Sequence, residues 1–155
     1  MRAELINPFL TATHDVFSTM LGCTLTRGPL GLKQDRAPVH EVSGMIGLSG
    51  QYRGMVLVSV GRETALNAAG ILLGERPTEL GEDVLDAVGE LTNMIVGAAK
   101  TQLEEYRLSI GLPTVICGQV QSIKFPPEAS PIVIPFDSEI GPICLEVGLV
   151  DSPKG

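Results

Sequence analysis

The sequence predicts an α+β domain with an antiparallel or mixed sheet of about six strands and three helices packed on one face. Segments with the apolar spacing of helices alternate with short segments rich in β-branched residues. Short turns link consecutive strand segments, which favours antiparallel pairing and helices on one side of the sheet. The 155 residues are the size of one folding unit, so we expect a single domain over residues 1–155.

The composition excludes several classes of protein. Hydrophobic residues make up 44% and charged residues 19%, which a disordered chain does not show. A net charge of −7 makes a poor nucleic-acid binder, because such binding depends on Lys and Arg that neutralise phosphates. No apolar run approaches the length of a membrane span, and the N-terminus lacks the pattern of a signal peptide. We expect a cytoplasmic protein that uses neither nucleic acid nor membrane.

The first half is expected to hold one helix and about three strands. Apolar spacing predicts a helix over 7–21, with Asn7 as N-cap, Pro8 at the first helical position and Gly22 after its end. The strands are expected within 23–32, 39–50 and 54–61, the last two around a turn from Gly50 to Gly54.

The second half is expected to hold two helices and about three strands. A short helix over 62–74 ends at Gly74, and Thr78 can cap a long helix that runs to about Arg107. The strands are expected within 113–125, 132–136 and 142–150. Both halves contain Glu-Leu-x-Asn, at Glu4 and at Glu90, followed by apolar helix and then strands, so the chain could be a duplicated half-domain.

The cysteines and histidines offer no metal site. Cys23, Cys117 and Cys144 show no C-x-x-C spacing, which predicts buried free thiols. His14 and His40 have no nearby Cys or His to complete a ligand set. We therefore expect neither a metal nor a cofactor in this chain.

The long helix separates an apolar side from a polar side. Its core side is expected to carry Val88, Leu91, Ile95, Ala99, Gln102 and Tyr106, widened by Leu85, Val96 and Leu103. A single row on the opposite side, here called the exposed row, consists of Asp86, Glu90, Asn93, Gly97, Lys100 and Glu104. A solvated face is the simplest interpretation, since amphipathic helices always have one.

Two residues of the exposed row favour a docking surface instead. Asn93 and Gly97 are poor helix formers at exposed positions, and Gly97 leaves room for a partner. Asp86 and Glu90 make a poor acid/base pair, because exposed carboxylates stay ionised. The amide of Asn93 can accept from a water and donate to an oxygen, which is the water-positioning work that glutamine does in GTPases.

At these residues the sequence resembles the CheC/CheX/FliY family of chemotaxis phosphatases, and the CheX branch most. The family signature, Asp/Ser-x-x-x-Glu-x-x-Asn, reads Asp86-Ala-Val-Gly-Glu90-Leu-Thr-Asn93 here. The surrounding segments INPFL, VFSTM, SGMIGLSG and GMVLVSV also look like this branch. The resemblance covers nearly the whole chain.

The resemblance implies a homodimeric phosphatase that acts on the phospho-aspartate of a CheY-like response regulator. It implies that Asn93 orients the attacking water and that Glu90 contacts the lysine of the receiver's active site. Asp86 matches the first signature position, and with Gly97 and Lys100 it is expected to bind the partner. The receiver would supply the Mg²⁺.

Two alternatives remain for the function. The helix could dock a receiver or a flagellar or signalling partner without catalysis, or it could be only the solvated face of a structural dimer. Glu4 and Asn7 are expected to be an inactive relic, because no residue matches the first signature position and Pro8 disfavours helical geometry at Asn7.

Overall fold

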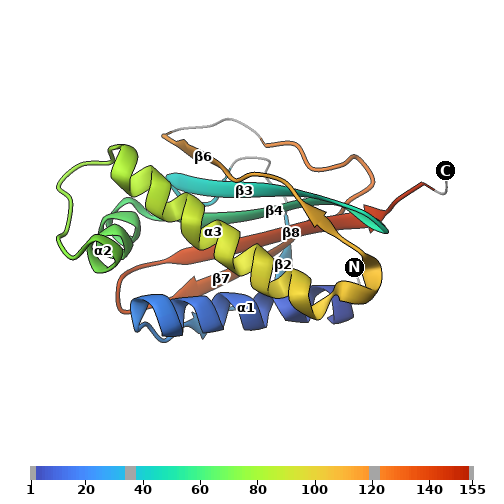
Figure 1. Cartoon of the computed structure of the whole chain (residues 1–155), viewed down its shortest axis with the longest axis horizontal. Helices are drawn as coiled ribbons and strands as arrows, with labels where there is room; N and C mark the ends of the chain where they lie inside the picture. The colour runs from blue at the N-terminus through green and yellow to red at the C-terminus, as the bar shows by residue number, and fades with distance from the viewer. Residues whose placement is uncertain (1–2, 34–37, 119–122, 154–155) are drawn as a thin grey trace.

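The computed structural model describes residues 3–33, 38–118 and 123–153, and it confirms the α+β class (Figure 1). The helices of these residues are α1 (Ala3–Leu21), α2 (Arg62–Leu73) and α3 (Glu82–Gln102), with a 3₁₀ turn η1 (Glu104–Tyr106) after α3. The strands of the first half are β1 (Thr26–Arg27), β2 (Gly31–Leu32), β3 (Val42–Ser49) and β4 (Tyr52–Val60). Those of the second half are β5 (Ser109–Ile110), β6 (Thr114–Cys117), β7 (Ile132–Asp137) and β8 (Ile143–Asp151).

The strands form one antiparallel sheet with a symmetric order. The order is β1-β7-β8-β4-β3-β5, with β2 also paired to β7 and β6 also paired to β3. Strands β4 and β8 pair along their whole lengths at the centre, where Val56 lies opposite Val147. Each half therefore contributes one central strand, one neighbour and two short edge strands, as expected of a duplicated half-domain. The described part of the sheet has eight strands rather than about six, because three of the edge strands are only two residues long.

One face of the sheet carries the helices and the main core. Helices α1 and α3 lie side by side across this face, and α2 packs against α3 (Figure 1). The core between the layers is mainly aliphatic and includes three phenylalanines, Phe9, Phe17 and Phe136, all at most 2% exposed. Ile95 of α3 and Leu145 of β8 are fully buried in the same core.

The start of α1 differs from the prediction. The helix begins at Ala3, so Asn7 is a helical residue and not an N-cap, and Pro8 lies inside the helix. The proline removes the hydrogen bond to the carbonyl group of Glu4, which costs about 3 kcal/mol. Leu5 and Ile6 are only 2% and 4% exposed, and burying such side chains stabilises by about 1.5–3 kcal/mol each. Burial along the extra turn therefore offsets the cost of the proline.

Smaller differences concern the ends of elements. Helix α3 begins after Gly81, not after Thr78, and it gives way at Leu103 to the 3₁₀ turn, which ends at Arg107 in a left-handed conformation. The turn between β3 and β4 needs only Gly50 and Gln51, because Gly50 adopts a φ of 126°. Of the strand segment expected within 113–125, β6 is seen, whereas 119–122 lie outside the described residues.

The cysteines are free, but one of them is not buried. Cys23 and Cys144 are buried, as expected, whereas Cys117 is exposed at the end of an edge strand, so the prediction for it is wrong. Burial raises the pKa of the Cys144 thiol to about 12, with a further contribution from the nearby Glu146 carboxylate. None of the described helices is long and apolar enough to span a bilayer.

An ion pair is buried beside Cys144 in the sheet. Glu146 of β8 is fully buried and pairs with the ammonium group of Lys33, whose side chain is 7% exposed. Burial raises the pKa of Glu146, and the hydrogen bond and charge of Lys33 oppose that rise. The β8 register places Glu146 opposite Leu57 and Val133, on the side of the strand opposite to core residues Leu145 and Val147.

Candidate functional site

The inner side of helix α3 is buried against the core and largely follows the predicted stripe. The side chains of this stripe that are buried are Val88, Leu91, Ile95, Val96, Ala99 and Leu103. Leu85 and Tyr106 are half-buried at its margins, and the ring of Tyr106 packs edge-on against Tyr52 of β4. Gln102 is exposed, so its predicted place in the core is wrong.

The charges at the two ends of α3 stabilise the helix. Its first turn carries the acidic residues Glu82 and Asp83 and its last turn carries the basic residue Lys100, and both signs are favourable to the helix dipole.

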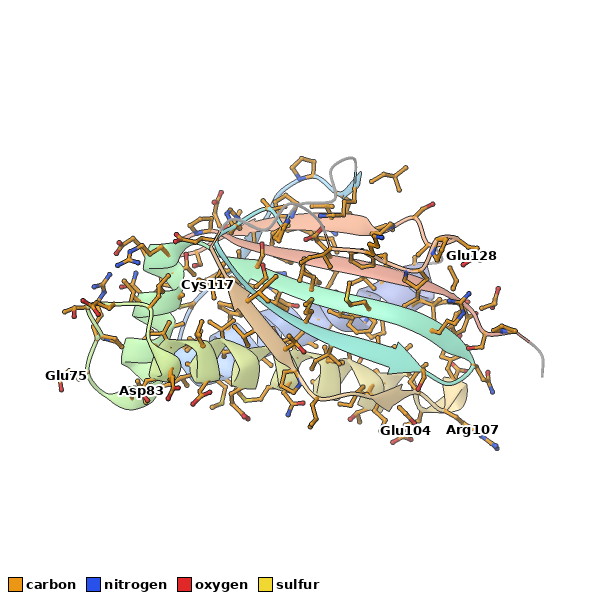
Figure 2. The ribbon with its side chains drawn as sticks, turned by 90° about the horizontal axis from the view of Figure 1, so that it is seen from above. Glu75, Asp83, Glu104, Arg107, Cys117 and Glu128 are labelled. Carbon is orange, nitrogen blue, oxygen red and sulfur yellow. The ribbon has the colours of Figure 1, made fainter. Side chains whose placement is uncertain are left out.

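The exposed row lies on the outer side of α3, as predicted. Asp86, Glu90 and Lys100 are exposed, and Asn93 and Gly97 are partly exposed. Glu104 continues the row into the 3₁₀ turn and points away from the sheet (Figure 2). Among the described residues, no hydrogen bond or ion pair engages the side chains of Glu90 and Asn93, so both are available to a partner.

The geometry of Glu90 and Asn93 suits them to act together. They are three positions apart on one helix, so their side chains are neighbours on the same surface. A carboxylate can bind a cation, and a carboxamide can accept a hydrogen bond from water while donating one to a second oxygen. The described residues contain no cluster of three or more His, Cys, Asp or Glu suited to a metal ion. The arrangement can bind and position groups that a partner brings.

Gly97 is not required by the packing of the protein itself. Apart from its own helix backbone, a Cβ atom built on Gly97 meets no atom of the described residues within 4 Å. Gly89 on the same helix differs, because a Cβ there would lie 3.2 Å from Cγ2 of Val115 in β6. Glycine in a helix costs about 1 kcal/mol relative to alanine. Its use at Gly97 is therefore consistent with a surface kept clear for a partner.

The height of α3 above the sheet is set by a contact that the sequence did not reveal. A Cβ atom on Gly44 of β3 would lie 2.1 Å from Oγ1 of Thr92 and 3.0 Å from its Cβ. Thr92 is fully buried, and its hydroxyl donates a hydrogen bond of 2.7 Å to the carbonyl group of Val88. Helix and strand therefore meet almost backbone to backbone, one residue before Asn93. A glycine opposite a threonine in the fold leaves no spacing signal in the sequence.

The first-half counterpart of the Glu-x-x-Asn pair also lies on a helix surface. Glu4 and Asn7 are both exposed on α1. Pro8 was expected to disfavour helical geometry at Asn7, but Asn7 is helical and Pro8 lies inside α1, so the expectation of a non-helical Asn7 is wrong. The inactivity of this segment stays a prediction.

Comparison with solved structures places the fold in the class of CheC-like proteins. The fold is that of a CheC-like superfamily protein from Shewanella sp. PV-4, with a TM-score of 0.89, 34% identity and coverage of 97% of this chain and 99% of that one. A chemotaxis protein CheX from Vibrio vulnificus matches with a TM-score of 0.86 and 36% identity over 96% of this chain and all of that one.

The sequence comparison narrows the class to one family. The sequence model described as "Chemotaxis phosphatase CheX" matches residues 42–137, which include the whole of α3. The CheY-P phosphatase CheX of Thermotoga maritima is 30% identical over 128 residues, which are 80% of this chain and 82% of that protein. The chain belongs to the CheX family of chemotaxis phosphatases.

A further relative has been solved together with its partner. The structure of the CheX–CheY–BeF₃–Mg²⁺ complex from Borrelia burgdorferi matches with a TM-score of 0.82 and 26% identity, over 97% of this chain and all of that one.

Proposed function

We propose that this chain is a protein phosphatase that hydrolyses the phospho-aspartate of a CheY-like response regulator. Membership of the CheX family supports this activity, as does the name of the Thermotoga relative, a CheY-P phosphatase. The Borrelia complex supports a receiver as the partner. We place the reaction in the cytoplasm, in chemotaxis or a related two-component pathway, and we propose a homodimer.

The observation that carries the proposal is the outward-facing pair of Glu90 and Asn93 on a helix with a buried inner side. Asn93 orients the attacking water through its amide, and Glu90 binds the lysine of the receiver's active site. Such a reaction depends on positioning more than on covalent chemistry, and holding a reactant in place is worth several orders of magnitude in rate. The phosphoryl group, the Mg²⁺ and the lysine all come from the receiver, so this chain needs no cofactor.

The other residues of the exposed row provide the docking surface. Asp86 lies one turn before Glu90 and adds a second carboxylate on the side that meets the lysine. Gly97 lies one turn after Asn93 and admits the backbone of the receiver. Lys100 lies in the last turn and is exposed to acidic groups of the partner.

The test is release of phosphate from a phosphorylated receiver of the same organism, with and without the protein. We expect the protein to shorten the lifetime of the phospho-aspartate, and we expect Asn93→Ala to abolish this effect while the variant still folds and binds. A protein that binds the receiver without changing the lifetime would be an adaptor, and the phosphatase proposal would then be wrong.

A further inference from the structure

A bulge interrupts the edge of the sheet between β5 and β6. Both strands pair with β3, with Ile110 opposite Leu48 and Thr114 opposite Met45. Three residues, 111–113, therefore face only two on β3, 46 and 47. We call 111–113 the edge bulge. Its start is held by a hydrogen bond of 3.0 Å from the amide of Gly111 to the carbonyl group of Gly47. Bulges of this kind re-aim side chains away from the sheet.

The edge bulge lies against the helix that carries the exposed row. Cγ of Pro113 is 4.0 Å from the position that a Cβ atom on Gly89 would take. Gly89 immediately precedes Glu90 and lies one turn before Asn93, on the same side of the helix as Asn93. Figure 2 shows β6 slanting between Cys117 and the middle of α3, which brings the bulge beside that part of the helix.

The bulge holds a leucine out into solvent. Leu112 is 90% exposed, whereas the other exposed large hydrophobic side chains of the described residues are 43–66% exposed. Single exposed apolar residues are common on protein surfaces. Leu112 is different because it lies between two paired strands and directly precedes Pro113, which packs beside Gly89 of α3.

We propose that Leu112 is an apolar contact for the receiver domain, next to the polar contacts of the exposed row. This proposal rests on the proposed function and names a further determinant of the same docking surface. The partner is a receiver because the edge bulge packs beside Gly89, which immediately precedes Glu90, so the bulge continues the surface on which we propose that the receiver docks. An apolar anchor beside a polar, charged surface is the usual composition of an interface, where few residues carry most of the affinity.

The test compares Leu112→Ser with Leu32→Ser. Leu32 is 66% exposed on β2, which pairs with β7 near the opposite edge of the sheet, so it is a matched control. Loss of one apolar anchor corresponds to roughly tenfold in affinity. We expect Leu112→Ser to raise KM for the phosphorylated receiver about tenfold while kcat stays within twofold, and Leu32→Ser to change neither.

A binding measurement separates this proposal from the proposed function. Titration of the full-length protein with a beryllofluoride-activated receiver should give a Kd about tenfold higher for Leu112→Ser than for the wild type. Wild-type binding without phosphate release would contradict the phosphatase while leaving this comparison intact. An unchanged Kd for Leu112→Ser, an equal rise for Leu32→Ser, or no binding by the wild type would overturn the proposal. The proposal would also be overturned if Leu112→Ser changed the oligomeric state on gel filtration without changing the Kd. That result would assign Leu112 to a contact between copies of the chain.

Discussion

The close contact between Gly44 and Thr92 gives a prediction with a magnitude. In Gly44→Ala the new methyl group would lie 2.1 Å from Oγ1 of Thr92, whereas ordinary contact begins at 3.4 Å, so α3 must rise by about 1.3 Å unless the threonine side chain rotates away. Rotation of the threonine side chain relieves only part of this overlap. It sacrifices the hydrogen bond to Val88, and Cβ of Thr92 still lies 3.0 Å from the new methyl group, about 0.4 Å inside ordinary contact.

The expected effects are on both stability and rate. Overpacking of this kind destabilises by about 1–3 kcal/mol. A misplacement of about 1 Å in a positioned group can cost roughly 100-fold in rate, so we expect kcat to fall at least about tenfold. Asn93 directly follows Thr92 and moves with it. Thermal unfolding and phosphate release from a phosphorylated receiver measure the two effects.

A compensating variant makes the reasoning refutable. Thr92→Ala removes the oxygen that Gly44→Ala would strike and leaves only the overlap of about 0.4 Å with Cβ, so the double variant should recover most of the lost rate. If Gly44→Ala unfolds at the wild-type temperature and keeps the wild-type kcat, this contact does not position α3. If the variant is destabilised but its kcat is unchanged below its unfolding temperature, the coupling of helix height to catalysis is wrong.

Three further predictions concern other parts of the molecule. Gly97→Ala should stabilise the protein by about 0.5–1 kcal/mol in chemical denaturation, because the new methyl group clashes with none of the described residues. The same variant should weaken receiver binding, and unchanged binding would exclude a close approach of the receiver at Gly97. The double variant Glu4→Ala/Asn7→Ala should keep the wild-type rate of phosphate release, and a folded variant without activity would establish a second site on α1. Lys33→Met should lower the free energy of unfolding by about 3–5 kcal/mol at neutral pH, because it leaves the buried Glu146 carboxylate unpaired. Lys33 opposes the rise that burial causes in the pKa of Glu146, so its removal raises this pKa further. The loss relative to the wild type should therefore grow as the pH rises above the ordinary carboxyl range and shrink on acidification. A loss independent of pH would contradict this.

The sequence was sufficient for the features that depend on local periodicity. The 100° rotation between helical residues sorted Val88, Leu91 and Ile95 to the core and Glu90 to the surface, and the structure places them so. The repeated Glu-Leu-x-Asn segments indicated a duplication, which agrees with the symmetric strand order.

Features that depend on tertiary packing could not be predicted in this way. Pro8 disfavours a helix at the residues before it, but the burial of Leu5 and Ile6 against the rest of the fold outweighs this local preference. The contact of Gly44 with Thr92 joins residues 48 positions apart, and neither residue is unusual in its own segment. The edge bulge arises only when β5 and β6 both pair with β3, so the sequence alone did not indicate a role for Leu112.

The most direct test of the central claim is the rate of phosphate release from a phosphorylated receiver with Asn93→Ala, beside Gln102→Ala as an exposed control on the same helix. If Asn93 orients the attacking water, its variant should lose roughly 100-fold or more of the catalysed rate while binding the beryllofluoride-activated receiver normally, and the control should match the wild type. Retention of the full rate by Asn93→Ala, or a loss of only a few-fold, would contradict the account.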